Sequence, residues 1–182
     1  MRVICGFVAA IGLVAVAGSA RGQATASAPN PGPPTPCVGN ADRHRFDFWV
    51  GEWQVTTANG NVVGSSSVQS MAGGCGLLEN WTAANGTTGK SLNAYNPVSK
   101  QWQQYWVGQG GAVTEYRESE WHDGSLSLIA RASARSVAAA PIQRLTFTPV
   151  NDSTVRQHGE VSADSGSTWT TTYDFYYHRR RT

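Results

Sequence analysis

The chain has 182 residues, of which 40% are hydrophobic and 14% charged, and its formal net charge at pH 7 is +2. Without Arg2 and Arg21, which lie in the N-terminal segment described next, twelve basic residues face twelve acidic ones. Proteins bind nucleic acid largely by neutralising phosphates with lysine and arginine, so a neutral chain excludes this class of partner on electrostatic grounds.

The first 24 residues have the pattern of a secretory signal peptide. Arg2 precedes an apolar run at residues 3–17, which is too short to span a bilayer comfortably, and small residues then offer cleavage sites. We therefore predict a signal peptide over residues 1–24 and a secreted or periplasmic location. A retained N-terminal anchor is the alternative. No later segment is long and apolar enough to cross a membrane, so we expect no integral membrane segment once the signal is removed.

Residues 25–37 are rich in proline, alanine and serine, which favours an extended, solvated tether. Cys5 would leave with the signal, so the exported chain keeps Cys37 and Cys75. Two cysteines in an exported protein most simply form one disulfide, with two free thiols as the alternative. This bond would join the tether to the turn between the second and third strands. No metal site is expected, because no histidine or acidic residue lies at ligand spacing from the cysteines.

The folded domain is predicted to begin with a short helical turn at residues 42–50. Phe46, Trp49 and Val50 would form one apolar face, at the i, i+3 and i+4 spacing of a helix. A short turn with such a face is suited to plug the open end of a β-barrel.

Ten strand-like runs follow this turn, and several are joined by strong turn signals. Asn59-Gly60 and Asn85-Gly86 are typical two-residue hairpin connections. Every connection is short, so strands adjacent in sequence should be adjacent in the sheet. A sheet of this size exposes two edges unless it closes, which favours an all-β, up-and-down antiparallel barrel of about ten strands over a two-sheet sandwich. The predicted strands are residues 53–58, 62–71, 77–83, 90–95, 101–107, 113–121, 126–132, 143–150, 154–162 and 168–177.

These strands form one predicted barrel domain at residues 38–178. Residues 179–182 follow as a basic tail with three consecutive arginines. A short charged end of this kind is expected to be solvated, and anchoring to a surface is the alternative role. The oligomeric state stays open at this point.

The opening block at residues 46–53, FDFWVGEW, and the meander after it resemble the calycin superfamily of lipocalins, fatty-acid-binding proteins and nitrobindin-like barrels. The chain is more specifically similar to a group of exported bacterial proteins of unknown function that begin with such a block. The resemblance implies a barrel fold and no settled activity, although such barrels usually hold a small ligand in their interior. Lipocalins also have an arginine that packs on the tryptophan of the first strand, and the sequence does not indicate its equivalent here.

Strand alternation sorts the polar side chains of the last two strands by face. Arg156, His158 and Glu160 share one face of the ninth strand, and Asp174 and Tyr176 share one face of the tenth. In one interpretation they are the solvated outside of the barrel. In the other they point inward with aromatic residues and form a ligand pocket, since interiors that tolerate charge are usually ligand sites. The candidate ligand-binding residues are then Trp81, Asn93, Tyr95, Trp106, Arg156, His158, Glu160 and Tyr176.

These residues predict an exported small-molecule-binding protein, a carrier or sensor, that holds an apolar or aromatic ligand in the barrel interior. A first alternative is an isomerase or hydrolase with a carboxylate–histidine pair in the same cavity, for which the candidate catalytic residues are His158, Glu160 and Asp174. A second alternative, suggested by nitrobindin-like barrels, is haem held from the barrel wall by His158 or His178. A structural protein with a filled interior is the plainest alternative.

Overall fold

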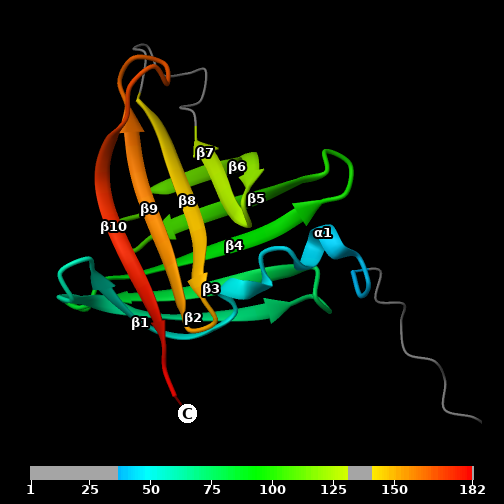
Figure 1. Ribbon diagram of the computed structural model, residues 1–182, viewed down its shortest axis with the longest axis horizontal. Helices are drawn as coiled ribbons and strands as arrows, with labels where there is room; N and C mark the ends of the chain where they lie inside the picture. The colour runs from blue at the N-terminus through cyan, green and yellow to red at the C-terminus, as the bar shows by residue number, and fades with distance from the viewer. Residues whose placement is uncertain (1–36, 131–140, 182) are drawn as a thin grey trace, which may run out of the picture. The chain divides into compact units, whose positions relative to one another are not determined.

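The structure is a computed structural model that describes residues 37–130 and 141–181. The predicted signal peptide and residues 25–36 of the predicted tether lie outside the described residues. Ten antiparallel strands form a closed barrel in which each strand pairs with its sequence neighbour and the last pairs with the first (Figure 1). The prediction of an all-β, up-and-down barrel is therefore confirmed, and the two-sheet sandwich is wrong. Closure removes both free sheet edges, which is the physical advantage that favoured it.

The strand bounds overlap the predicted ranges in every case, although residues 131 and 132 of the predicted seventh strand lie outside the described part. Differences at the other ends are a few residues. The strands are β1 Gly51–Thr57, β2 Val62–Met71, β3 Gly76–Ala83, β4 Thr88–Asn96, β5 Gln101–Gly108, β6 Val113–His122, β7 Ser125–Ala130, β8 Ile142–Asn151, β9 Thr154–Ser162 and β10 Thr170–Arg179.

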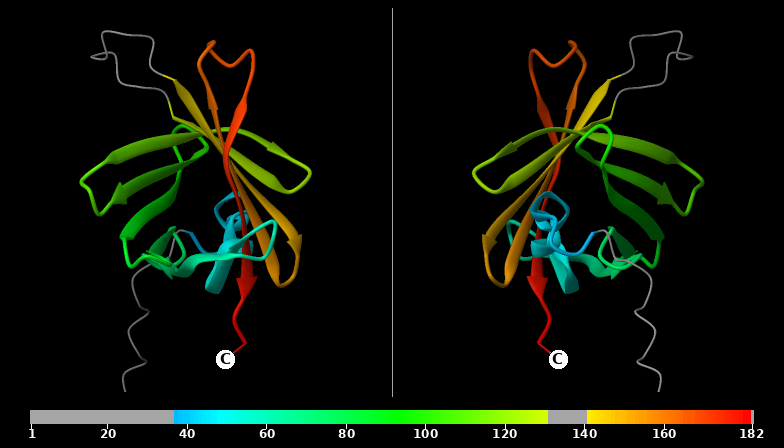
Figure 2. Two further views of the ribbon diagram at one scale, coloured as in Figure 1. Left: turned by 90° about the vertical axis from the view of Figure 1, so that its left-hand side faces the viewer. Right: turned by 90° about the vertical axis from the view of Figure 1, so that its right-hand side faces the viewer.

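The predicted helical turn at residues 42–50 is instead two short pieces. Helix α1 spans Ala41–His44, and the 3-10 helix η1 spans Asp47–Trp49. The side chain of Asn40 accepts a hydrogen bond from the Asp42 amide at 3.1 Å, so the helix begins earlier than expected. Both pieces lie at the end of the barrel from which the C-terminus leaves, opposite the β9–β10 loop (Figure 2). We call these the closed end and the open end.

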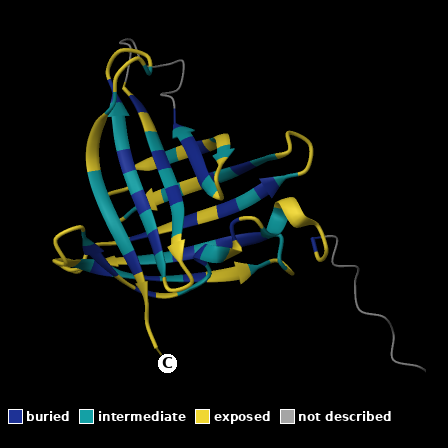
Figure 3. Cartoon of the chain, in the orientation of Figure 1, coloured by how far each residue is buried: buried dark blue, intermediate teal, exposed yellow. Residues whose placement is uncertain are grey.

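The closed end is filled by interlocking aromatic rings. Phe46 is fully buried and stacks on Trp49, with ring centroids 5.2 Å apart, and it meets Phe147 edge-on at 4.9 Å. Trp53 donates its indole N–H to the Trp49 carbonyl at 2.9 Å. Figure 3 shows the alternation of buried and exposed residues along the strands around this core. Phe46 and Trp49 therefore plug this end of the barrel as predicted, because both side chains are part of the hydrophobic core.

The predicted disulfide is confirmed: Cys37 is bonded to Cys75, with Cα atoms 5.2 Å apart. It joins the segment before α1 to the turn between β2 and β3. His44 adds two contacts there, since its Nε2 lies 3.0 Å from the Cys37 carbonyl oxygen and its Nδ1 lies 2.7 Å from Asp47. The Asp47 carboxylate raises the pKa of His44. The disulfide therefore ties this segment to the barrel covalently, and the contacts of His44 hold the segment itself together.

Arg179 explains why the sequence places Gly51 two residues before Trp53. It is the last residue of β10 rather than part of a tail, and its guanidinium lies over the Trp53 ring at 4.3 Å. Its Nη1 donates to the Val50 carbonyl at 2.9 Å. A Cβ atom at Gly51 would overlap this guanidinium, and the φ of 149° there is one that other residues rarely adopt. Arg179 thus packs on the tryptophan of the first strand, a contact that the sequence did not indicate.

Candidate functional site

A cavity of about 170 Å³ lies inside the barrel beyond the aromatic core of the closed end. Aromatic and aliphatic side chains form most of its wall, and a small set of polar groups interrupts them. Ligand pockets of proteins commonly have this composition. The lining residues are Glu79, Trp81, Gln104, Trp106, Tyr116, Leu145, Gln157, Tyr173, Phe175 and Tyr177.

Three of the aromatic side chains lie flat against a neighbouring strand, each over a glycine. A Cβ atom at any of these glycines would overlap the ring above it, and no side chain is there to lift the ring into the lumen. Flat rings line the wall and leave the space in front of them open. The pairs are Trp81 over Gly64, Trp106 over Gly89 and Tyr173 over Gly159.

The rings on one side of the cavity form a continuous stack. Trp81 and Phe175 are nearly parallel, with an interplanar angle of 10° and centroids 6.2 Å apart. Phe175 in turn stacks on Tyr173 at 4.7 Å. Side chains of β3 and β10 thus combine into one aromatic surface, although these strands are far apart in the sequence.

Glu79 is the one carboxyl group among the residues that line the cavity, and it is 3% exposed. Ser66 donates to its Oε1 at 3.0 Å and Ser91 donates to its Oε2 at 2.9 Å. The Tyr177 hydroxyl lies 3.4 Å from Oε1. Burial disfavours the charged form and raises the pKa of Glu79 to about 7, against the lowering effect of these three hydroxyls.

The hydrogen bonds continue from Glu79 through a buried polar chain. The Asn93 amide nitrogen donates to the Ser91 hydroxyl at 2.9 Å, and Gln104 donates to Asn93 Oδ1 at 2.9 Å. On the other side, the Tyr177 hydroxyl donates to Gln157 Oε1 at 2.9 Å. Each side chain of this hydrogen-bond chain has at least one partner, so the bonds hold Glu79 and Gln104 in fixed positions.

The four predicted ligand-binding residues of β3, β4 and β5 do not all line the cavity. Trp81 and Trp106 line the cavity. Asn93 is fully buried beside it and supports the polar chain. Tyr95 lies at the closed end instead, where its ring packs on Trp102 at 6.2 Å and its hydroxyl lies 3.4 Å from Asp42.

The other predicted site residues lie on the outer face of the barrel, which corrects their assignment to the cavity. Over residues 154–160 of β9, Val155, Gln157 and Gly159 are buried and the residues between them are not. Arg156, His158 and Glu160 therefore point outward. The same alternation on β10 turns Tyr173, Phe175 and Tyr177 inward. The residues that therefore lie outside are Arg156, His158, Glu160, Asp174 and Tyr176.

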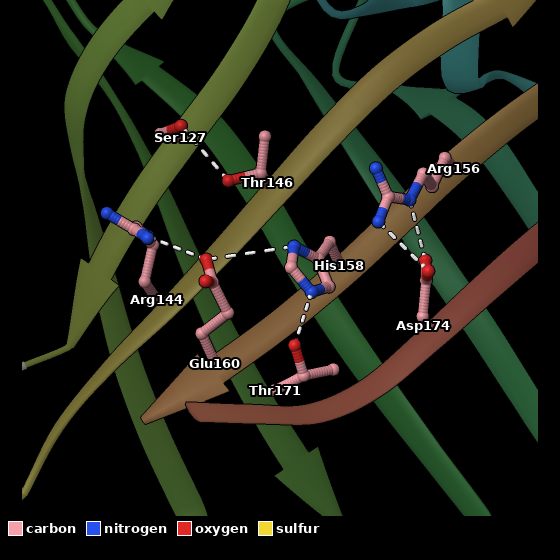
Figure 4. A network of polar contacts seen from close by, with 8 residues as sticks. All are labelled: Ser127, Arg144, Thr146, Arg156, His158, Glu160, Thr171 and Asp174. Atoms are coloured by element: carbon pink, nitrogen blue, oxygen red, sulfur yellow. Dashed lines mark hydrogen bonds and ion pairs between the residues drawn. The ribbon is translucent and has the colours of Figure 1, made fainter. Parts of the chain in front are cut away.

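Most of these side chains form an outer polar network across β8, β9 and β10 (Figure 4). Arg156 binds both carboxylate oxygens of Asp174, at 2.7 and 2.9 Å, which lowers the pKa of Asp174. Arg144 donates to Glu160 at 2.8 Å, and His158 Nδ1 lies 3.7 Å from the same oxygen. The carboxylate–histidine pair therefore exists, but it faces outward and is not part of the cavity.

Haem does not fit the residues of the cavity. None of the four histidines lines it. His158 Nε2 lies 2.9 Å from Thr171 Oγ1, and His178 Nε2 lies 3.2 Å from Thr56 Oγ1, both on the outer face. Pockets for drug-sized ligands have volumes of about 300–1,000 Å³, well above that of this cavity. Within residues 37–130 and 141–181, no group of three or more His, Cys, Asp or Glu residues could hold a metal ion.

Sequence reasoning missed Glu79 as a site residue, and with it Gln104, Gln157 and most of the β10 aromatics. One signal was available: Glu79 shares its strand face with Leu77 and Trp81, so a lone acidic residue alternates with two large apolar ones. An acidic side chain is rarely fully buried unless it is paired, so its position between two large apolar residues is unusual. The pattern alone did not show that this face points inward.

In the described ranges, neither helix has the length and apolar character needed to cross a membrane. In the comparisons with known proteins, the chain matches no family model and no curated protein.

Proposed function

We propose that this protein is an exported small-molecule-binding protein, a carrier or sensor, that holds a small aromatic or apolar ligand in the barrel interior. The observation that carries the proposal is the cavity of about 170 Å³ with flat aromatic walls. An engineered cavity of about 150 Å³ in another protein accepts benzene, so this volume suits one ring and its substituents. Flat rings favour stacking with a planar ligand.

Binding is favoured over catalysis because the carboxylate–histidine pair faces away from the cavity. A solid structural interior is disfavoured by the three glycines that keep the aromatic rings against the wall. If this region were closely packed, larger residues would be expected in place of the three glycines.

Export is part of the same proposal. The disulfide between Cys37 and Cys75 suits an oxidising compartment, and the predicted signal peptide at residues 1–24 would direct the chain there. We also propose that the chain is a member of the calycin-like exported group suggested by its opening block. The packing of Arg179 on Trp53, behind Gly51, supports that membership.

The proposal is tested with the single substitution Gly89→Ala, which places a methyl group where the Trp106 ring now lies. The displaced ring disturbs the cavity wall, so binding of benzyl alcohol or indole should weaken about tenfold, the equivalent of one aromatic contact. Titration calorimetry and the ligand-induced rise in melting temperature measure this effect.

Gly110→Ala is the matched control, because nothing lies within 4 Å of a Cβ atom there. Native mass spectrometry of protein purified from its own host would detect the natural ligand. Protein that is always empty, together with no melting-temperature rise across a broad panel of small aromatics, would contradict the proposal.

A further inference from the structure

The cavity contains a buried carboxyl group without a positive partner in the described part of the chain. The salt bridges found there involve other acidic residues, namely Asp42, Asp47, Glu115, Asp123, Glu160 and Asp174. Glu79 has only hydroxyl partners. An isolated carboxylate in an apolar interior is costly, and a cation that enters the cavity would remove that cost.

The hydrogen-bonding capacity left around Glu79 is mainly that of acceptors. The protons of Ser66 and Ser91 are directed at Glu79, and the Gln104 amide nitrogen is directed at Asn93. The carboxylate therefore keeps lone pairs, and Gln104 keeps its carbonyl oxygen, for a ligand that lies in the cavity. Gln157 contributes an amide donor beside them, since its carbonyl oxygen accepts from Tyr177. A ligand group with several N–H donors complements this arrangement best.

The aromatic rings favour the same kind of ligand. Ring faces carry negative electrostatic potential and attract cations within about 6 Å of the ring centroid. Trp81, Phe175 and Tyr173 form a continuous stack beside Glu79, and Trp106 lies on another part of the wall. Attraction to the rings and attraction to the carboxylate therefore act on one charged group.

We infer that the ligand of this cavity is a small organic cation of about one ring, a primary ammonium or an amidinium, whose charged group contacts Glu79 and whose apolar body lies against the aromatic wall. This inference rests on the proposed function and names its ligand class. A carboxylate ligand is excluded by repulsion from Glu79 when that group is ionised.

Binding of such a cation should depend on pH through Glu79. The titratable groups that face it are the phenols of Tyr116, Tyr173 and Tyr177, and burial raises the pKa of all three above 10, so they stay neutral. The other neighbouring strands β2, β4, β5 and β9 present uncharged Ser66, Ser91, Gln104 and Gln157. Since burial raises the pKa of Glu79 to about 7, a cation that binds in mildly acidic solution must displace a proton.

The test compares three probes of one shape: benzylammonium, benzyl alcohol and benzoate, titrated calorimetrically into the purified disulfide-bonded protein. Benzylammonium keeps its charge, like a lysine side chain, throughout the range used. We expect it to bind at least tenfold more tightly than benzyl alcohol near pH 7.5, and to lose about 20-fold in affinity near pH 5.5 as Glu79 becomes protonated. Benzoate should not bind.

Glu79→Gln keeps the size of the side chain and removes the charge. It should weaken benzylammonium binding by about 30-fold or more and change benzyl alcohol binding by a much smaller factor. Glu115→Gln is the matched control: this residue lies on the same strand as the cavity residue Tyr116, but its side chain is exposed on the opposite face.

Two results would overturn the inference while the proposed function stands: benzyl alcohol bound as tightly as benzylammonium, or benzylammonium affinity unchanged in Glu79→Gln. If that variant does not fold, the pH dependence of the unaltered protein decides, and a constant affinity between the two pH values overturns the inference. Failure of all three probes to bind at millimolar concentration would overturn the proposed function together with the inference.

Discussion

The two halves of the barrel interior use the same residue types in opposite ways. At the closed end, Phe46, Trp49 and Phe147 are fully buried and interlock with ring centroids 4.7–5.2 Å apart. In the cavity, Trp106 and its counterparts lie flat over glycines and enclose a void that contains Glu79. The composition of a layer therefore does not decide whether it is solid or hollow. In the cavity, a glycine beneath each of three rings leaves that ring against the wall.

This difference separates stability from binding. Fully buried, interlocked rings contribute to folding through apolar burial and dispersion. Residues around a cavity lose part of those contacts, and a buried carboxyl group lowers the stability further when it ionises. We expect substitutions at the closed end to change the free energy of unfolding most, and substitutions in the cavity to change pH dependence and binding.

The largest effect is expected for Phe46→Ala at the closed end. Removal of a fully buried phenylalanine should lower the free energy of unfolding by about 3–5 kcal/mol, because both the apolar burial and the packing around the void are lost. Urea denaturation followed by tryptophan fluorescence measures this loss. Val98→Ala, at a position that is 91% exposed, should change stability by less than about 0.5 kcal/mol. A loss below about 1 kcal/mol for Phe46→Ala would show that the plug is not part of the core.

The second effect is a fall in stability with rising pH, caused by Glu79. Burial raises its pKa from 4.5 to about 7, so between these values the group ionises in the unfolded chain and not in the folded one. Its contribution is fully present below pH 4.5 and is lost as the pH rises through about 7, with a total of at most about 3 kcal/mol.

The pH effect is measured as the difference in unfolding free energy between the unaltered protein and Glu79→Gln across this range. The glutamine variant cannot ionise, so subtraction cancels the contributions of all other titrating groups that the two proteins share. A difference that stays constant from pH 4.5 to 7 would contradict an elevated pKa for Glu79.

The smallest effect is expected for Arg179→Ala, at the rim of the closed end. The guanidinium lies over the Trp53 ring but its side chain is exposed, so its removal should cost about 0.5–1 kcal/mol. Chemical denaturation of Arg179→Ala beside Arg180→Ala, its neighbour beyond the strand end, isolates the contact with the ring. Equal stability of the two variants would mean that Arg179 behaves as a solvated tail residue.

Several features of the fold could be predicted because they depend on neighbouring residues. Asn59-Gly60 and Asn85-Gly86 favour tight turns by their own backbone preferences, and the structure has a turn at each. Cys37 and Cys75 were the only cysteines left after the predicted signal, so their pairing followed from counting. The inward packing of Phe46 and Trp49 followed from their spacing.

The candidate site could be predicted only in part. Trp81 and Trp106 were identified as cavity residues, while Arg156, His158 and Glu160 were placed in the cavity by an interpretation that the structure corrects. A strand has two faces with the same period, and the pattern of β9 offered polar residues on one and small or apolar residues on the other. The choice between them depends on the direction in which the sheet curls.

The sequence alone determined the strands, their order and the pairing of the cysteines, because these follow from local preferences and from short connections. Only the tertiary structure decided which side chains share the interior. Tyr177 and Glu79 lie 98 residues apart, yet their side chains meet because closure brings β10 next to β1 and turns both faces inward. Arg179 reaches Trp53 for the same reason, since the last strand pairs with the first. Contacts across a closed barrel depend on its curvature and register, and no local pattern contains them.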